Sequence, residues 1–94
     1  MFNNGFIQQN NNMSNDDVAQ KIRKDIIGEL EAIIQYEQHA MSTNNMKMQK
    51  IWKDISSEEK VHIGELMMAL FYFDPDSKVQ FEKGVEEFEQ LTRQ

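Results

Sequence analysis

Residues 18–41 read VAQKIRKDIIGELEAIIQYEQHAM, and this stretch decides the fold. Its apolar residues recur mainly at steps of three and four, which is the period of an α-helix with one apolar face. They are Val18, Ile22, Ile26, Ile27, Leu30, Ile33, Ile34, Ala40 and Met41. Just upstream, Ser14 and Asp17 have the spacing of a capping box, with Asp in place of the usual Glu. We therefore predict one helix of roughly 25 to 30 residues that begins near Ser14.

A second long helix follows after a short break. Ser42-Thr43-Asn44-Asn45 interrupts the pattern with residues that prefer turns and caps. The helical spacing of apolar residues then resumes at Met48, Ile51, Trp52, Ile55, Ile63, Leu66, Ala69, Leu70 and Phe73. We expect this helix to end at Asp74-Pro75, because proline disfavours helical geometry in the residue before it.

A third, short helix is expected beyond the proline, with Asp76 or Ser77 as its cap. Its apolar residues are assigned to one side of the helix: Val79, Phe81, Val85, Phe88 and Leu91. No β-strand is needed anywhere in the pattern. The sequence therefore predicts an all-α fold, with a long antiparallel αα-hairpin followed by a short C-terminal helix.

The size of the chain indicates that this hairpin needs a partner. A domain of 94 residues is near the lower end of what buries a self-sufficient core, and no cysteine is present to form a disulfide. An αα-hairpin leaves broad apolar faces uncovered, and the short third helix cannot cover both. Two hairpins packed together form a four-helix bundle, so we predict that dimerisation completes the fold.

The N-terminal segment has a different composition. Residues 1–13 are rich in Asn and show no sustained period, so we predict a mobile tail there and a helical domain over residues 14–94. Phe2 and Phe6 leave open the alternative that the tail is a docking peptide, and Met13 could be the true start of the chain.

Charge and hydropathy limit the classes of partner. Sixteen acidic and ten basic residues give a formal charge of −6, which attracts cations and argues against nucleic acid as a partner. No apolar stretch approaches the roughly 18 to 20 residues of a membrane span, and the N-terminus lacks the order of a signal peptide. We expect a soluble cytoplasmic protein.

Two carboxylates stand where the apolar stripes should be unbroken. At about 100° per residue, Glu29 falls near the middle of the apolar face of the first helix. Glu59 falls inside the stripe of the second helix, and His62 lies on the same face. A buried carboxylate without a partner is costly, so we expect each to be paired, protonated or metal-bound. Arg23, Lys24 and Lys60 are not placed to pair with them.

The spacing Glu59-x-x-His62 suits a metal, because residues three apart share one helix face. Di-iron helix bundles use one Glu from each of two helices and Glu-x-x-His from each of the other two. One chain supplies half of that set, with Glu29 as the isolated Glu. Two chains would supply four carboxylates and two imidazoles, a ligand set that suits iron or manganese rather than zinc or copper.

Other interpretations of these residues remain open. Glu29 and Glu59 could instead bind basic residues of a partner without any metal. Glu37 is near the end of its helix, where it can reach water, and His39 is expected at the surface rather than as a ligand. Trp52 is expected in the core, and five methionines are expected to fill gaps in the core or in subunit contacts. These are Met41, Met46, Met48, Met67 and Met68.

The same residues resemble the ferritin-like superfamily, and within it the encapsulated ferritins, whose subunits are half-size. The similarity runs from about Ile22 to Pro75. Its motifs are Gly28-Glu29-Leu30-Glu31-Ala32, Tyr36, Ser57-Glu58-Glu59-Lys60-Val61-His62 and Phe73-Asp74-Pro75.

This resemblance implies a ferritin-like four-helix bundle completed by dimerisation, and a ferroxidase that oxidises Fe(II) with dioxygen or peroxide at a di-iron site between two subunits. Glu29, Glu59 and His62 would be ligands, with Tyr36 beside them. Glu31 and Glu58 would be candidates for a secondary cation site. The resemblance also implies homodimers assembled into a ring-like oligomer such as a decamer, inside an encapsulin nanocompartment.

Two features depart from the family. Gln35 stands where members often have tryptophan, which weakens the secondary cation site. The sequence ends at Gln94 without an extension like the family's targeting tail, so either a tail was removed or the protein is not cargo.

Two other functions are compatible with parts of this pattern. A rubrerythrin-like di-iron peroxidase would keep the site, but the chain has no Cys-x-x-Cys segment to deliver electrons. A non-catalytic helical assembly protein would form oligomers that do not depend on metal.

Overall fold

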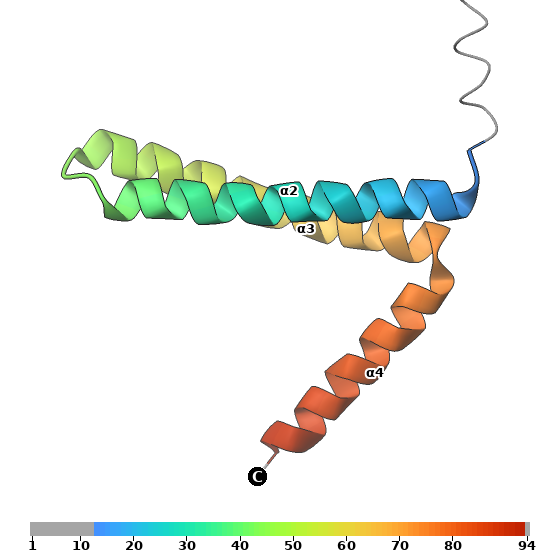
Figure 1. Ribbon diagram of the computed structural model, residues 1–94. Coiled ribbons are helices and arrows are strands. Elements are labelled where there is room, and N and C mark those ends of the chain that lie inside the picture. The colour runs from blue at the N-terminus through green and yellow to red at the C-terminus, as the bar shows by residue number, and fades with distance from the viewer. Residues whose placement is uncertain (1–12, 94) are drawn as a thin grey trace, which may run out of the picture.

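The computed structural model describes residues 13–93, which form three helices: α2 (Asn15–Met41), α3 (Met46–Phe73) and α4 (Pro75–Thr92). No strand occurs within this part of the chain, so the prediction of an all-α fold is confirmed. Figure 1 shows α2 and α3 as a long hairpin, from one end of which α4 extends away. The predictions for the first twelve residues, including the docking role of Phe2 and Phe6, lie outside the described residues.

The start of α2 confirms the predicted capping box. The backbone N–H of Asp17 donates to Ser14 Oγ at 3.1 Å, and the Ser14 N–H donates to Asp17 Oδ2 at 3.4 Å. Two N–H groups that the helix leaves without an internal partner are thereby satisfied. Asp16 and Asp17 also place negative charge in the first turn, where the helix dipole favours it.

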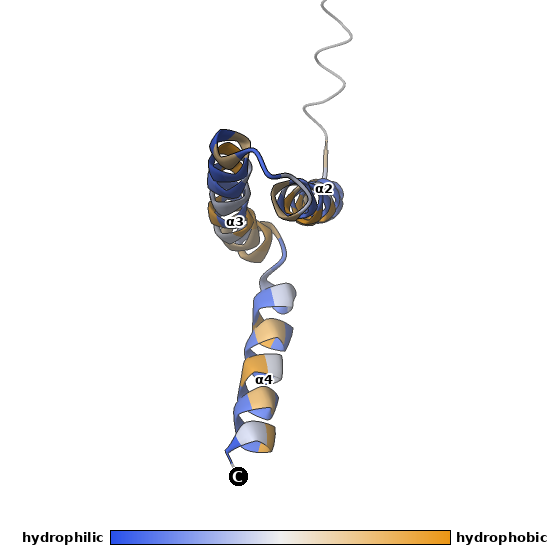
Figure 2. Cartoon of the chain, turned by 90° about the vertical axis from the view of Figure 1, so that its left-hand side faces the viewer, coloured by the Kyte–Doolittle hydropathy of each residue, from blue (hydrophilic) through white to orange (hydrophobic). Residues whose placement is uncertain are grey.

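A tight turn reverses the chain between the two long helices. Asn45 caps α3, since its side chain accepts the N–H of Met48 at 3.0 Å. Gln49 Nε2 donates to the Thr43 carbonyl at 2.6 Å and holds the turn against the first turn of α3. The two helices therefore run antiparallel and lie side by side, as the end-on view in Figure 2 shows.

The core of the single chain is small. Ala19, Ile22 and Leu70 form its buried centre, where the start of α2 meets the end of α3. Many large apolar side chains stay at least half exposed, which agrees with a hairpin that needs a partner. Of the two roles predicted for the methionines, the core role does not apply within this chain to Met41, Met46 and Met68, which are 65 to 81 % exposed. Their role in subunit contacts stays a prediction.

The start of α4 differs from the prediction. The helix begins at Pro75 with Asp74 as its N-cap, not at a cap on Asp76 or Ser77. Proline fits the first helical position because its φ is preset and no N–H is needed there. Asp74 accepts Arg23 Nη2 of α2 at 2.6 Å and Ser77 Oγ at 2.8 Å, so this junction is tied to the hairpin.

The α4 helix has 18 residues, none of them buried. The grouping of its apolar residues on one side is wrong for Val79. That residue stands two positions before Phe81, so the two side chains point to different sides of the helix. No helix among the described residues combines the length and apolar character needed to cross a membrane.

Candidate metal centre

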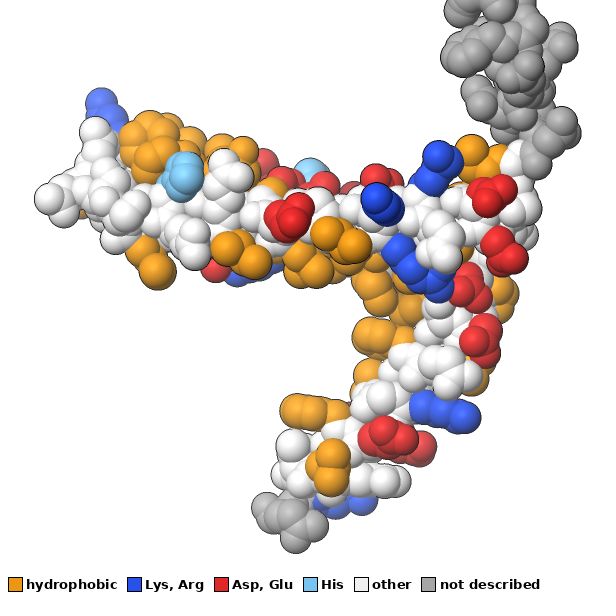
Figure 3. Space-filling model, viewed as in Figure 1, with side chains coloured by type: hydrophobic (Ala, Val, Ile, Leu, Met, Phe, Trp, Pro, Cys, Tyr) orange, Lys and Arg blue, Asp and Glu red, His pale blue; other side chains and the backbone are white. Residues whose placement is uncertain are grey.

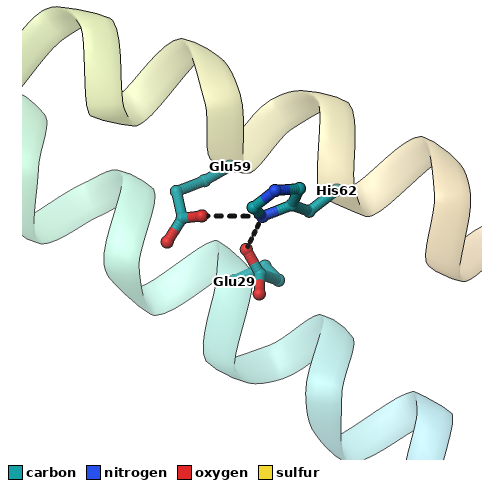
Figure 4. Close-up of side chains that lie close together, drawn as sticks. All are labelled: Glu29, Glu59 and His62. Carbon is teal, nitrogen blue, oxygen red and sulfur yellow. Dashed lines mark hydrogen bonds and ion pairs between the residues drawn. The ribbon is translucent and has the colours of Figure 1, made fainter.

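Three side chains converge across the seam between α2 and α3. Glu29 comes from the middle of α2, and Glu59 and His62 come from one face of α3 (Figure 4). One ligand atom from each lies within 4.8 Å of the others. Within residues 13–93 these three form the only such group of three His or acidic side chains. The structure thus brings together the three residues predicted as ligands.

The imidazole of His62 occupies the middle of the group. Its Nδ1 lies 2.9 Å from Glu59 Oε1 and 3.3 Å from Glu29 Oε1. The first contact joins residues three apart on a helix, and the second crosses the seam. In the tautomer or charge state that carries a proton on Nδ1, this N–H can donate to either carboxylate, at the point where the three side chains face each other.

The electrostatics of the group favour a cation. The hydrogen bond to Glu29 raises the pKa of His62 above its usual value; partial burial opposes this shift, and Glu59 adds to it. Neither Glu29 nor Glu59 forms an ion pair with a lysine or arginine of the described chain. Arg23 pairs with Asp74, and Lys60 pairs with Glu37 at 2.9 Å. The two carboxylates therefore have only the histidine as a positive partner.

The donor set fits a hard divalent metal. Two carboxylates and one imidazole suit iron or manganese, and a metal would take the place of the proton on His62. The His62 side chain is 49 % exposed, compared with 25 % for Glu29 and 18 % for Glu59. An octahedral ion takes about six donor atoms. One chain thus offers an incomplete, open site.

Three other predicted residues lie apart from this group. Tyr36 is half-buried, and within the described residues its hydroxyl makes no hydrogen bond to Glu29, Glu59 or His62. Its ring instead lies 6.3 Å from that of His39, which stands edge-on to Trp52 at 5.0 Å. Glu31 and Glu58 are exposed and do not belong to the metal-binding group.

A second polar contact across the seam was not predicted from the sequence. Ser56 is 1 % exposed, and its hydroxyl donates to Glu37 Oε2 at 2.8 Å. Lys60 and then Ser56 lower the pKa of Glu37, against a smaller opposing effect of burial. Its position in the sequence could have indicated its burial, because Ser56 falls beside Trp52 and Ile63 on the helix face that meets α2.

Comparison with known proteins adds two relatives, although no family model matches the chain. The chain is 38 % identical over 77 residues to a ferritin-like-encapsulin shell fusion protein of Pyrococcus furiosus, covering 82 % of this chain and 22 % of that protein. It is 34 % identical over 68 residues to the encapsulin nanocompartment cargo protein EncB of Myxococcus xanthus, covering 72 % and 42 %. The chain thus spans less than half of each of these relatives.

A solved structure matches over most of its own length. The encapsulated ferritin domain from Pyrococcus furiosus superposes with a TM-score of 0.83 at 35 % sequence identity. The match covers 87 % of this chain and 84 % of that domain, so the two agree in sequence and in fold.

Proposed function

The chain belongs to the encapsulated ferritins, and from that premise we propose that it is a ferroxidase that oxidises Fe(II) to Fe(III) at a di-iron site between two copies of the chain. The observation that carries this proposal is the convergence of Glu29, Glu59 and His62 within 4.8 Å, with no lysine or arginine of the described chain paired to either carboxylate. The negative charge of the two carboxylates is thus left for a bound metal ion to neutralise.

The need for two chains follows from the donor count. One hairpin contributes one Glu and one Glu-x-x-His, which is half of the ligand set of a di-iron bundle. A second hairpin packed on the exposed side of His62 would complete four carboxylates and two imidazoles. It would also exclude water from the site, which strengthens the attraction between carboxylates and metal.

The protein side chains hold the substrate and take part in proton exchange. Each ferrous ion gives up one electron, and dioxygen or peroxide accepts the electrons. A protonated imidazole cannot bind iron, so the raised pKa of His62 means that iron and a proton compete for its side chain. Tyr36 is proposed to act beside the ligands, and Glu31 and Glu58 are proposed to attract iron at the surface. Manganese is the alternative metal for the same donors.

The proposed setting is iron storage or detoxification in an encapsulin nanocompartment within the cytoplasm. The names of both relatives support it, since one is fused to an encapsulin shell and the other is a nanocompartment cargo protein. We propose a homodimer that assembles further into a ring-like oligomer, with a decamer as one such size, and an encapsulin shell protein as partner.

The test is iron oxidation in single-residue variants. Anaerobic apoprotein receives ferrous iron and then air, and ferric absorbance is followed. The rate should fall by at least about tenfold in Glu59→Ala and His62→Ala, because a lost ligand should cost no less than a lost outer-shell partner. Glu65→Ala is the matched control, since Glu65 is exposed on the same helix and lies outside the group of ligands.

Equal rates in wild type and both ligand variants would contradict the proposal. If the purified protein also carried no metal and its mass did not respond to iron, the function would be that of a non-catalytic helical assembly protein. Faster consumption of peroxide with an electron donor than simple oxidation of iron would identify a peroxidase instead.

A further inference from the structure

The apolar residues of α2 do not by themselves determine which side of this helix is turned toward α3. Ile26 and Ile33 are half-buried, and Ile26 packs against the core. Ile27 and Ile34, each one position further along, are 54 and 57 % exposed. Figure 3 shows exposed hydrophobic side chains along the hairpin. The two isoleucine pairs are chemically identical and lie about 100° apart around the helix, so within one chain the burial of either pair would remove a similar apolar area from water.

The metal-binding group depends on this choice. A rotation of α2 by one residue would bring the exposed isoleucine pair to the seam and put Leu30 in the place of Glu29. His62 would then face an apolar side chain, and the three donor atoms would no longer converge. The hydrophobic effect is non-directional and does not oppose such a rotation. A polar contact with a fixed partner is needed to prevent it.

The polar contacts at the two ends of the hairpin do not distinguish the two rotations. Arg23 binds Asp74 at the open end, but the next residue, Lys24, would bring another cation to the same place. At the turn end, Gln49 donates to the backbone carbonyl of Thr43, which does not depend on the side chains of α2.

The contact of Glu37 does distinguish them. The Ser56 hydroxyl donates to Glu37 Oε2 at 2.8 Å, and Lys60 Nζ lies 2.9 Å from the same oxygen. Ser56 is 1 % exposed and is the only buried polar side chain within residues 13–93. After a rotation by one residue, the neutral amide of Gln38 would stand in the place of Glu37. The amide oxygen can accept the hydroxyl, but Lys60 would lose its carboxylate.

These residues lie close to the metal ligands without joining them. Ser56 lies one turn before Glu59, and Lys60 follows Glu59 directly. Lys60 therefore leaves α3 about 100° away from Glu59, on the other side of the seam. Glu37 lies about two turns after Glu29 on α2. The side chains of Lys60 and Glu37 are 59 and 45 % exposed, so their ion pair is screened by solvent, and the buried hydroxyl anchors it.

We propose that Ser56, Glu37 and Lys60, here called the seam triad, fix the rotation of α2 against α3 and thereby hold the metal ligands of the two helices together. They are positioning residues and do not bind the metal. For its effect on iron this inference rests on the proposed ferroxidase function, whereas the rotation itself is independent of iron.

The first test uses the full chain without iron. His62 Nδ1 lies 3.3 Å from Glu29 Oε1, so nuclear Overhauser effects between the His62 ring and the Glu29 methylene protons report the rotation. They should be present in the wild type. They should lose much of their intensity in Glu37→Gln and in Lys60→Gln, because both rotations are then populated. Glu65→Gln is the matched control, exposed on α3 and outside the seam triad, and should leave them unchanged.

The second test is rescue. Glu37→Lys combined with Lys60→Glu exchanges the two charges and should restore the Overhauser effects, which a general loss of stability would not allow. The affinity for ferrous iron, measured without oxygen, should follow the same order. It should fall about tenfold or more in Glu37→Gln and in Lys60→Gln, as for other residues that orient metal ligands, and should recover in the exchanged pair.

Unchanged Overhauser effects in both single variants would overturn the inference, and so would failure of the exchanged pair to restore them. Wild-type iron affinity in variants whose Overhauser effects are weakened would overturn it as well. A wild type that binds no ferrous iron would instead contradict the proposed function, and the Overhauser comparison would still decide the rotation.

Discussion

The hairpin and α4 are built from the same kind of amphipathic helix, but the hairpin buries part of its apolar faces and α4 leaves its apolar face exposed. In the hairpin, α2 and α3 bury part of their apolar stripes against each other, and Ile22 and Leu70 are less than 9 % exposed. In α4 the row from Phe81 to Leu91 has no buried member. A helical period of apolar residues therefore predicts the stripe, while the tertiary partner decides whether it becomes a core or an interface.

The two sides of the hairpin make a second contrast. Both sides place a glutamate beside a cationic group across the same seam. Glu37 meets Lys60, a permanent cation, and this contact needs no metal. Glu29 meets only His62, whose charge depends on its proton. On the side of Glu29 and His62, the negative charge is therefore not fully neutralised by a lysine or arginine of the described chain.

The largest expected effect tests the contrast between hairpin and α4. Leu70→Ala should lower the free energy of unfolding by about 2 to 4 kcal/mol, because it opens a cavity in the small core. Phe88→Ala should change it by less than about 0.5 kcal/mol, because Phe88 is 65 % exposed. Urea unfolding of dilute apoprotein, below the concentration of self-association, measures both. Equal losses would show that α4 packs on its own hairpin.

A smaller effect is expected from two neighbouring serines. Ser56→Leu should cost about 1 to 3 kcal/mol, because Ser56 is 1 % exposed and a larger side chain would push the helices apart. Ser57→Leu should be close to neutral, since Ser57 is exposed. Urea unfolding of the two variants makes the comparison, and a neutral Ser56→Leu would mean that the seam is loosely packed.

The N-cap of α2 should contribute less to the free energy of unfolding than the packing around Ser56. Ser14→Ala removes the hydroxyl that accepts the Asp17 N–H and should cost about 1 kcal/mol or less. Ser14→Asp keeps a side-chain acceptor and should restore most of the loss. Thermal unfolding followed by circular dichroism measures both variants. A full loss in Ser14→Asp would argue against the capping role.

The smallest effect concerns the junction between hairpin and α4. Hydrogen bonds from Ser77 and Arg23 lower the pKa of Asp74 in the folded state. The stability that the Asp74 carboxylate contributes is therefore complete above the ordinary pKa of an aspartate, about 3.9. It is lost as the pH falls through the lower pKa of the folded state. The groups are partly exposed, so solvent and salt weaken the effect. The protection of amides at the start of α4, measured against an unfolded peptide at the same pH, should therefore fall in acid. In Asp74→Asn this protection should be low already at neutral pH, and protection that follows the wild-type pH profile would exclude Asp74 as the tie.

Much of the fold could be predicted because its signals are local. The capping pair Ser14 and Asp17, the turn before α3 and the end of α3 at Asp74 each depend on residues close in sequence. The exact start of α4 differs from the prediction because a proline can both end one helix and occupy the first position of the next, as Pro75 does. The direction of α4 could not be predicted, since it depends on Arg23, more than fifty positions away in sequence.

The candidate site was predictable to the extent that helix phase determines it. Glu29, Glu59 and His62 converge because each interrupts an apolar stripe at the seam. The contact of Ser56 with Glu37 was not predicted, since a lone serine on a helix carries no signal of its burial. Tyr36 follows Glu29 by seven residues on α2, which places it about 10 Å further along the helix. What the spacing does not predict is that the Tyr36 ring lies 6.3 Å from that of His39.

The metal centre is proposed to close only between two chains. Native mass spectrometry of the anaerobic protein, titrated with ferrous iron, distinguishes a shared site from a site within one chain. A shared site should give a species of two chains with two iron ions, no iron retained by a single chain, and loss of the iron from the pair in Glu59→Ala. Single chains that hold iron as tightly as the pair, or wild-type pairs that hold none, would contradict it.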